Sequence, residues 1–249
     1  MAIEIIALHC AVFAASLLQA ASGIGFGVLA GPALLLVLNS GGAIQISILL
    51  SLLIALLLSP GLWGRVNRTV FRHLLVGTGL GIPLGLVVFM VTPILLLKTF
   101  AMIAVLFMLW VSMRSTGVRR AESVMTAGVE GVGIGTVSGL MGASLGMPGP
   151  VVAAWMTARQ EKKQAIRATI LVLFVPSYVG AFLVQQIAGV DEATLWLCLQ
   201  LLPATLAGVL IGKQLDGRIS DSVFRRVIKA VLLMTAMGLA IDITIRFSS

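Results

Sequence analysis

Apolar residues run through the chain in long stretches that short polar links separate. Six stretches have the length of about 20 mostly apolar residues that a membrane-spanning helix needs. They cover roughly 43–62, 74–91, 94–112, 165–187, 193–212 and 223–244. None of the links is long enough to hold a soluble domain. The pattern therefore predicts an all-α, polytopic transmembrane helical bundle.

Two further apolar segments, 3–38 and 124–157, are too long for a single crossing. One continuous helix of about 35 residues would extend about 52 Å, whereas the hydrocarbon core is about 30 Å thick. Glycine and proline interrupt the first segment between Ala20 and Pro32 and the second between Ser138 and Pro150. We expect each segment to form two short helices joined at a glycine-rich break.

The distribution of charge predicts the topology. Four links are rich in arginine and lysine: 63–73, 113–122, 158–167 and 213–222. The positive-inside rule places these links in the cytoplasm. The segment 124–157 lies between two of them, so it must leave the cytoplasm and return as a hairpin. By analogy 3–38 forms a hairpin from the outside, with both termini outside.

Composition agrees with this interpretation and excludes other classes. Of the 249 residues, 59% are hydrophobic and 10% are charged, whereas soluble domains carry roughly 25% charged residues. The net charge of +8 comes from short basic clusters between apolar runs, so no nucleic-acid partner is expected. Cys10 and Cys198 lie in apolar runs and form no CxxC pair. Because HExxH, GxSxG and P-loop lysine motifs are also missing, we expect no enzyme, no metal site and no cofactor.

The two halves of the chain resemble each other, as an internal duplication would produce. Residues 43–49 (AIQISIL) match residues 165–171 (AIRATIL) at four positions. Further matches in the same order are Gly23 and Gly27 with Gly142 and Gly146, Pro32 with Pro150, and Gly81 and Gly85 with Gly208 and Gly212. We therefore predict repeats over 1–122 and 123–249. Each repeat holds one hairpin and three crossings, so the second is inverted, as in many secondary transporters.

The glycine-rich stretches LQAASGIGFGVLAGP and GTVSGLMGASLGMPGPVV resemble the signature of the sulfite exporter TauE/SafE family, also called TSUP or DUF81. The resemblance extends over essentially the whole chain. It implies a multi-pass transporter in the bacterial inner membrane for a sulfur-containing anion such as sulfite, a sulfonate, sulfoacetate or thiosulfate. A passive anion channel and a transporter of small organic carboxylates are the alternatives. The substrate, the direction, the coupling ion and a homo-oligomeric state stay open.

The two breaks are the predicted binding site. A helix start leaves backbone N–H groups unpaired and carries about half a positive charge, so two helix starts facing one cavity would bind an anion without a buried lysine. We expect the breaks to meet near the membrane midplane. The candidate residues are Gln19, Ser22, Gly23, Gly25, Gly27, Ser138, Gly142, Ser144, Gly146 and Pro148. The polar ones either bind substrate or satisfy freed backbone groups.

A few ionisable residues within or beside the apolar runs need separate interpretations. Glu130 is either a proton-coupling carboxylate or a residue near the cytoplasmic surface. Lys98 is expected to extend to the outer interface, and Asp242 to pair with Arg246 four residues on. Arg167 either contacts the anion from the cytoplasmic side or only sets the topology.

Overall fold

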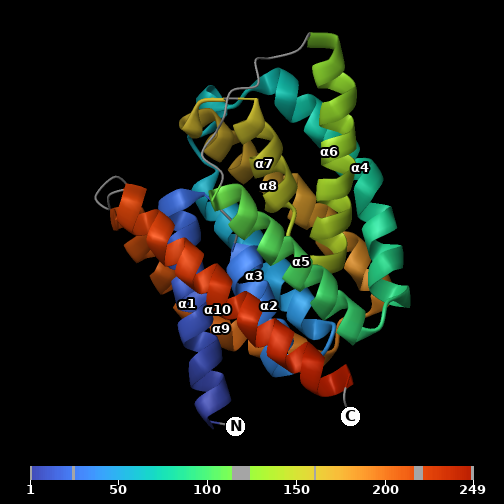
Figure 1. Cartoon of the computed structure of the whole chain (residues 1–249), viewed down its shortest axis with the longest axis vertical. Helices are drawn as coiled ribbons and strands as arrows, with labels where there is room; N and C mark the ends of the chain where they lie inside the picture. The colour runs from blue at the N-terminus through green and yellow to red at the C-terminus, as the bar shows by residue number, and fades with distance from the viewer. Residues whose placement is uncertain (1, 24–25, 114–123, 160, 216–220, 248–249) are drawn as a thin grey trace.

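The computed structural model describes residues 2–23, 26–113, 124–159, 161–215 and 221–247. These residues form α-helices and one short 3-10 helix, η1 (Figure 1). The helices are α1 (Ala2–Ser22), α2 (Phe26–Leu38), α3 (Gly42–Leu58), η1 (Trp63–Arg65), α4 (Arg68–Val91), α5 (Ile94–Met113), α6 (Val124–Leu145), α7 (Gly149–Ala158), α8 (Lys163–Ala188), α9 (Glu192–Leu215) and α10 (Asp221–Phe247). The predicted all-α helical bundle is confirmed.

The predicted crossings correspond to α3, α4, α5, α8, α9 and α10. By length and apolar composition, α1, α4, α5, α8 and α9 are able to cross a membrane. The helix α3 is apolar but has only 17 residues. Large apolar side chains such as Leu80, Leu84 and Leu210 are exposed on these helices, as expected for a surface that faces lipid.

Both long apolar segments break where glycine and proline predicted. The first breaks between Ser22 and Phe26, and the second between Leu145 and Gly149. Gly23 and Gly146 follow the ends of α1 and α6 with φ of +77° and +68°, a conformation that favours glycine. The arms are unequal, however: α1 and α6 have 21 and 22 residues, whereas α2 and α7 have 13 and 10. The expectation of short helices is therefore wrong for both first arms.

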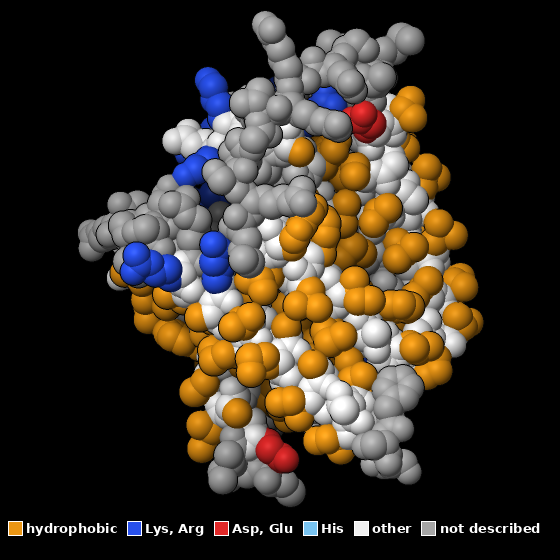
Figure 2. Space-filling model, viewed as in Figure 1, with side chains coloured by type: hydrophobic (Ala, Val, Ile, Leu, Met, Phe, Trp, Pro, Cys, Tyr) orange, Lys and Arg blue, Asp and Glu red, His pale blue; other side chains and the backbone are white. Residues whose placement is uncertain are grey.

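The two broken segments form hairpins that enter from opposite ends of the bundle (Figure 1). The α1–α2 hairpin begins at the end that holds both termini, and the α6–α7 hairpin begins at the other end. Figure 2 shows lysine and arginine side chains gathered towards the upper end of the molecule, with hydrophobic side chains covering the middle. This distribution agrees with cytoplasmic basic links; the topology itself stays a prediction.

Glycines let two pairs of long helices pack closely, α4 along α6 and α9 along α1. A β-carbon at Gly81 would overlap the carbonyl oxygen of Thr136, and one at Gly85 would overlap that of Leu140. The spacing Gly81-xxx-Gly85 therefore brings the backbones of α4 and α6 into direct contact, which only small residues allow.

The second half repeats this contact in the same register. A β-carbon at Gly208 would crowd the carbonyl oxygen of Phe13, and one at Gly212 would crowd that of Leu17. Phe13 and Thr136 are as far apart in the chain as Leu17 and Leu140 are. Equivalent glycines thus pack on equivalent atoms, which supports the predicted duplication. The inverted relation of the halves and the boundary between 1–122 and 123–249 stay predictions.

The register of the breaks differs from the sequence alignment. The alignment paired Gly23 with Gly142 and Gly27 with Gly146. By conformation Gly23 corresponds to Gly146, because both have positive φ and donate a backbone hydrogen bond to the residue four positions earlier. Glycines recur every four residues in the first motif, so a shift of one helical turn matches equally well in sequence. The paired prolines also lie differently, since Pro32 is inside α2 and Pro150 is in the first turn of α7.

Candidate functional site

The two breaks touch each other at Gly27 and Gly146. A β-carbon at Gly27, in the first turn of α2, would overlap the carbonyl oxygen of Gly146 and would lie 3.5 Å from Cα of Met147. One turn further, a β-carbon at Gly31 would lie 3.0 Å from Cε of Met147. The start of α2 therefore packs directly on the backbone of the second break. Only glycine allows these two segments of the chain to cross so closely. We call this contact the crossing.

Gln19 organises the first break. Its side-chain oxygen Oε1 accepts a hydrogen bond from the backbone N–H of Phe26 at 2.7 Å, and its backbone oxygen accepts one from Gly23 at 2.7 Å. The side chain is fully buried, and its Nε2 has no hydrogen-bond partner within the described part of the chain. One end of the amide thus satisfies the helix start, while the N–H donors at the other end have no acceptor among the described residues.

Arg167 reaches the first break from α8. Its Nη2 donates a hydrogen bond to the carbonyl oxygen of Ala20 at 2.8 Å. A β-carbon at Gly23 would overlap Cγ of Arg167, so the stem of the arginine lies directly on this glycine. Arg167 is half-buried. Its positive charge therefore lies beside the first break, and its two expected roles stay predictions.

The polar residues predicted at the second break hold its backbone. Ser138 Oγ donates to the carbonyl oxygen of Pro148 at 2.7 Å, and Ser144 Oγ donates to that of Leu140 at 2.7 Å. A β-carbon at Gly142 would lie 3.2 Å from the ring of Pro148, the residue before α7. Each serine hydroxyl therefore binds a backbone carbonyl oxygen, and the role of both serines towards a substrate stays a prediction.

Two predicted residues cannot be placed in the same way. Gly25 lies outside the described residues, and so does the side chain of Ser22. Their roles stay predictions.

Sequence analysis missed Ser47 and left Tyr178 out of the site. Ser47 is fully buried in α3, and its Oγ lies 3.1 Å from where a β-carbon of Gly146 would stand. This hydroxyl has no hydrogen-bond partner in the part of the chain that the structure describes. Tyr178 donates from its hydroxyl to the carbonyl oxygen of Gly146 at 3.3 Å. The alignment of Ser47 with Thr169 between the repeats was a signal for the first of them.

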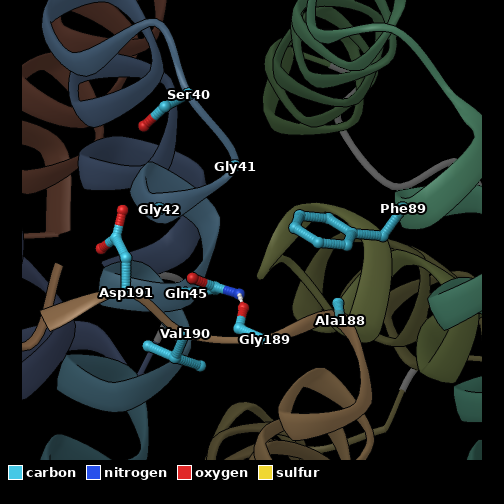
Figure 3. Close-up of a pocket in the computed structure, with 9 residues that line it drawn as sticks. All are labelled: Ser40, Gly41, Gly42, Gln45, Phe89, Ala188, Gly189, Val190 and Asp191. Atoms are coloured by element: carbon cyan, nitrogen blue, oxygen red, sulfur yellow. Dashed lines mark hydrogen bonds between the residues drawn. The ribbon is translucent and has the colours of Figure 1, made fainter.

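A cavity of about 540 Å³ opens where α3 begins and α8 ends (Figure 3). In Figure 3 the ring of Phe89 points towards it from the side opposite Asp191. Its lining residues are Ser40, Gly41, Gly42, Gln45, Phe89, Ala188, Gly189, Val190 and Asp191. The predicted topology places this cavity at the outer face of the membrane. Sequence analysis gave no indication of it, because its lining comes from three separate segments.

A chain of side-chain amides links this outer cavity to the second break. Nε2 of Gln45 lies 2.8 Å from the carbonyl oxygen of Gly189 and 3.3 Å from Oε1 of Gln185. Gln185 in turn donates to the carbonyl oxygen of Ala143 at 2.8 Å, near the end of α6. The side chains of Gln45 and Gln185 therefore connect the cavity with the backbone just before Gly146.

The pattern of broken helices has a counterpart among known protein families. The family model described as sulfite exporter TauE/SafE matches residues 8–239. The chain belongs to the sulfite exporter TauE/SafE family. It is accordingly a multi-pass membrane protein of a transporter family, in agreement with its membrane-length helices. No curated protein and no solved structure matches it significantly.

The cavity expected between the breaks of this TauE/SafE protein is closed, because the backbones of Gly27 and Gly146 occupy the crossing. The outer cavity stops at Gln45, and a second one, between α3, α4 and α8, is lined by Leu56, Ser59, Pro60, Trp63, Phe71, Leu75, Val172, Val175 and Pro176. Neither is lined by a residue of the breaks. The two breaks do come together, and the contact between Gly27 and Gly146 closes the space between them.

The ionisable residues of the TauE/SafE chain lie differently from expectation. Glu130 is 47% exposed and pairs with Arg159 at 3.0 Å, and both interpretations of its role stay predictions. Lys98 does not extend to the interface: its side chain is 0% exposed and its Nζ lies 2.5 Å from Oδ2 of Asp242. The expectation for Lys98 was wrong because its partner is remote in sequence, on α10.

Proposed function

We propose that this protein is a secondary transporter that moves a small sulfur-containing anion, such as sulfite, a sulfonate or thiosulfate, across the bacterial inner membrane. The anion binds where the two breaks cross. One observation carries the proposal: two buried donors, Nε2 of Gln19 and Oγ of Ser47, have no partner in the described chain and flank the crossing. An unsatisfied buried donor costs about 1–3 kcal/mol, so such donors are expected where a ligand supplies the acceptor.

The surrounding chemistry suits an anion with several oxygen atoms. The starts of α2 and α7 lie at the breaks, and each carries a partial positive charge. Arg167 adds a full charge beside Gly23. A sulfite or sulfonate group offers three oxygens, which can accept from Gln19, Ser47 and Arg167 together. The carbonyl oxygen of Gly146 now lies at the crossing, so it must turn away or withdraw before an anion occupies it.

The closed crossing favours a transporter over a passive channel. Contact between Gly27 and Gly146 blocks the route between the breaks, while the outer cavity stays open above Gln45. A transporter needs a state in which the central site is closed, and hairpins entering from opposite faces provide two parts that separate in turn. In this conformation solute from outside reaches Gln45 but not Ser47.

Flux measurements in proteoliposomes test the proposal. The purified protein is offered labelled sulfite, a sulfonate, thiosulfate and a small carboxylate. We expect saturable uptake of at least one sulfur anion, and an increase of about tenfold or more in KM for Ser47→Ala, since a hydrogen bond to a charged group contributes about 1.5–3 kcal/mol. Ser177→Ala is the matched control, because Ser177 is equally buried but bonds the carbonyl oxygen of Leu173.

Two results would contradict the proposal. Absence of uptake of every anion by the folded protein would remove the transport function. Equal KM values for Ser47→Ala and Ser177→Ala would move the binding site away from the crossing.

A further inference from the structure

Lys98 and Asp242 form an ion pair between α5 and α10 that the proposed binding site does not use. Of the charged side chains that the structure describes, Lys98 alone is fully buried. Its Nζ lies 2.5 Å from Oδ2 of Asp242, whose side chain is 22% exposed. Withdrawing two charges from water costs several kcal/mol per ion, and replacing such a pair with apolar residues is often neutral or stabilising. Stability alone is therefore a weak reason for its presence, and ionised groups within membrane segments indicate function by default.

The pair joins two helices that both contact the second arm of the first hairpin. The helices α5 and α10 lie side by side (Figure 1), and both also contact α2. A β-carbon at Gly238 of α10 would lie 3.0 Å from Cδ1 of Leu36 on α2. The start of α2 carries Gly27, which closes the crossing against Gly146. Any opening of the crossing by movement of α2 therefore changes its contact with the two helices that the pair joins.

Among the side chains that the structure describes, few other charges lie on the helices packed against this pair. The helices α2 and α7 contain no charged residue, and Lys98 is the only one in α5. Glu130 of α6 lies with Arg159 near the opposite end of the molecule from the end of α10. On α10 itself, Arg226 and Lys229 are several turns away. Arg246 lies one turn beyond Asp242, and its side chain is outside the described ones.

We infer that Asp242 is the proton-coupling carboxylate of the transport cycle and that Lys98 is its counter-charge, an inference that rests on the proposed transport function. One proton from the outer aqueous phase binds a carboxylate oxygen of Asp242, and no other bond forms or breaks. The carboxylate loses its charge, so its attraction to the Lys98 ammonium ends and α5 is no longer held to α10 at this point. When the pair re-forms, the carboxyl group releases its proton to the cytoplasmic aqueous phase, so one proton crosses the membrane with each transport cycle.

The surface pair of Glu130 is a weaker candidate for the same role. Glu130 is 47% exposed and Arg159 is 18% exposed. An ion pair open to solvent contributes little to stability, so neutralising it changes little in the energy of either conformation. Removing one partner of a buried pair is strongly destabilising, which is sufficient to shift a conformational equilibrium.

Two flux assays on the same proteoliposomes test the inference. The first measures exchange of the anion at equal pH on both sides, and the second measures accumulation driven by a pH gradient. For Asp242→Asn we expect exchange to continue and gradient-driven accumulation to fall at least tenfold. Since Asp242→Asn leaves Lys98 buried without its counter-charge, the double variant Lys98→Met/Asp242→Leu tests the same point in an uncharged, apolar contact. Glu192→Gln, an exposed carboxylate change on α9, is the control.

The outcomes separate this inference from the proposed function. Normal gradient-driven accumulation in the folded double variant would show that the pair only joins two helices. Loss of accumulation in Glu130→Gln, with none in the double variant, would return the coupling role to Glu130. A wild-type protein that exchanges anions without any response to a pH gradient would overturn the coupling inference and leave the transport function standing. A wild-type protein that exchanges no anion would overturn both.

Discussion

The two breaks have the same backbone conformation but are surrounded by different polar groups. Gly23 and Gly146 have the same left-handed conformation after equivalent helices. The first break is surrounded by an amide and a guanidinium, from Gln19 and Arg167. The second is surrounded by hydroxyl groups, from Ser138 and Tyr178, that bind its carbonyl oxygens. The predicted duplication would account for the shared shape of the breaks, while the charge beside the first break comes from Arg167 of α8.

Packing differs between the breaks as much as polarity does. The atoms that face Gly23 belong to the Arg167 side chain, which can move. The atoms that face Gly27 belong to the backbone of the second break, which cannot move without reopening the helix ends. The first break is therefore adaptable on its α8 side, whereas the crossing opens only when the two backbone segments separate.

The largest expected effect follows from adding a methyl group where Gly27 contacts Gly146. In Gly27→Ala the added methyl group would overlap the carbonyl oxygen of Gly146. Overpacking of this kind costs about 1–3 kcal/mol, and here it also forces the two breaks apart. We expect anion flux to fall about 100-fold or more and the melting temperature to drop.

Gly79→Ala is the control for this prediction, because Gly79 is exposed on α4 and an added β-carbon would have nothing within 4 Å. This change should keep flux and raise helix stability by up to about 1 kcal/mol. Flux and melting curves for both variants decide the matter, and a Gly27→Ala protein with normal flux would show that the crossing is not part of the route.

A smaller effect is expected from making the first break neutral. Arg167 aligns with Gln45 of the first half, so Arg167→Gln copies the residue that the duplicated segment already tolerates. Loss of one charge-assisted hydrogen bond of about 1.5–3 kcal/mol should raise KM for the anion roughly tenfold or more. The maximal rate should change much less.

The control for Arg167→Gln is Arg68→Gln, which removes an exposed charge at the start of α4. Steady-state uptake at fixed ionic strength separates the two variants. If both raise KM equally, then Arg167 acts only through the general positive potential of the cytoplasmic face.

These comparisons also show what the sequence could predict. Both breaks were predictable because glycine and proline interrupt apolar runs that are too long for one crossing. The close contact of Gly81 and Gly85 with α6 agrees with their spacing of four residues, which is typical of helices that pack closely. The role of Lys98 did not follow, because its partner Asp242 is 144 residues away and a lysine near the end of an apolar run usually extends to the interface. Local patterns identify elements and breaks, whereas the contacts that α3, α8 and α10 bring to them depend on the tertiary fold.

The smallest expected effect concerns the caps of two equivalent helices, α4 and α9. Asn67 precedes α4, and its side chain accepts a hydrogen bond from the N–H of Val70 at 3.3 Å. Asp191 precedes α9, and its Oδ1 accepts one from the N–H of Thr194 at 2.7 Å. The first half therefore has a neutral cap where the second has an ionised one. Hydrogen bonds from the Thr194 side chain and backbone lower the pKa of Asp191 below its ordinary value.

A lowered pKa in the folded state means that the carboxylate form stabilises the fold. This stabilisation is fully present well above the ordinary aspartate pKa of about 4, and it is lost as the pH falls through the lowered pKa. Asp191→Asn copies Asn67 and removes the titration, so its melting temperature should decline less than that of the wild type between pH 6 and pH 3. Near pH 7 the variant should melt slightly lower, since an amide is a weaker partner for the start of α9 than a carboxylate. Melting curves of the detergent-solubilised protein across this pH range measure the difference, and parallel declines in the two proteins would mean that the cap of α9 contributes no more than the neutral cap of α4.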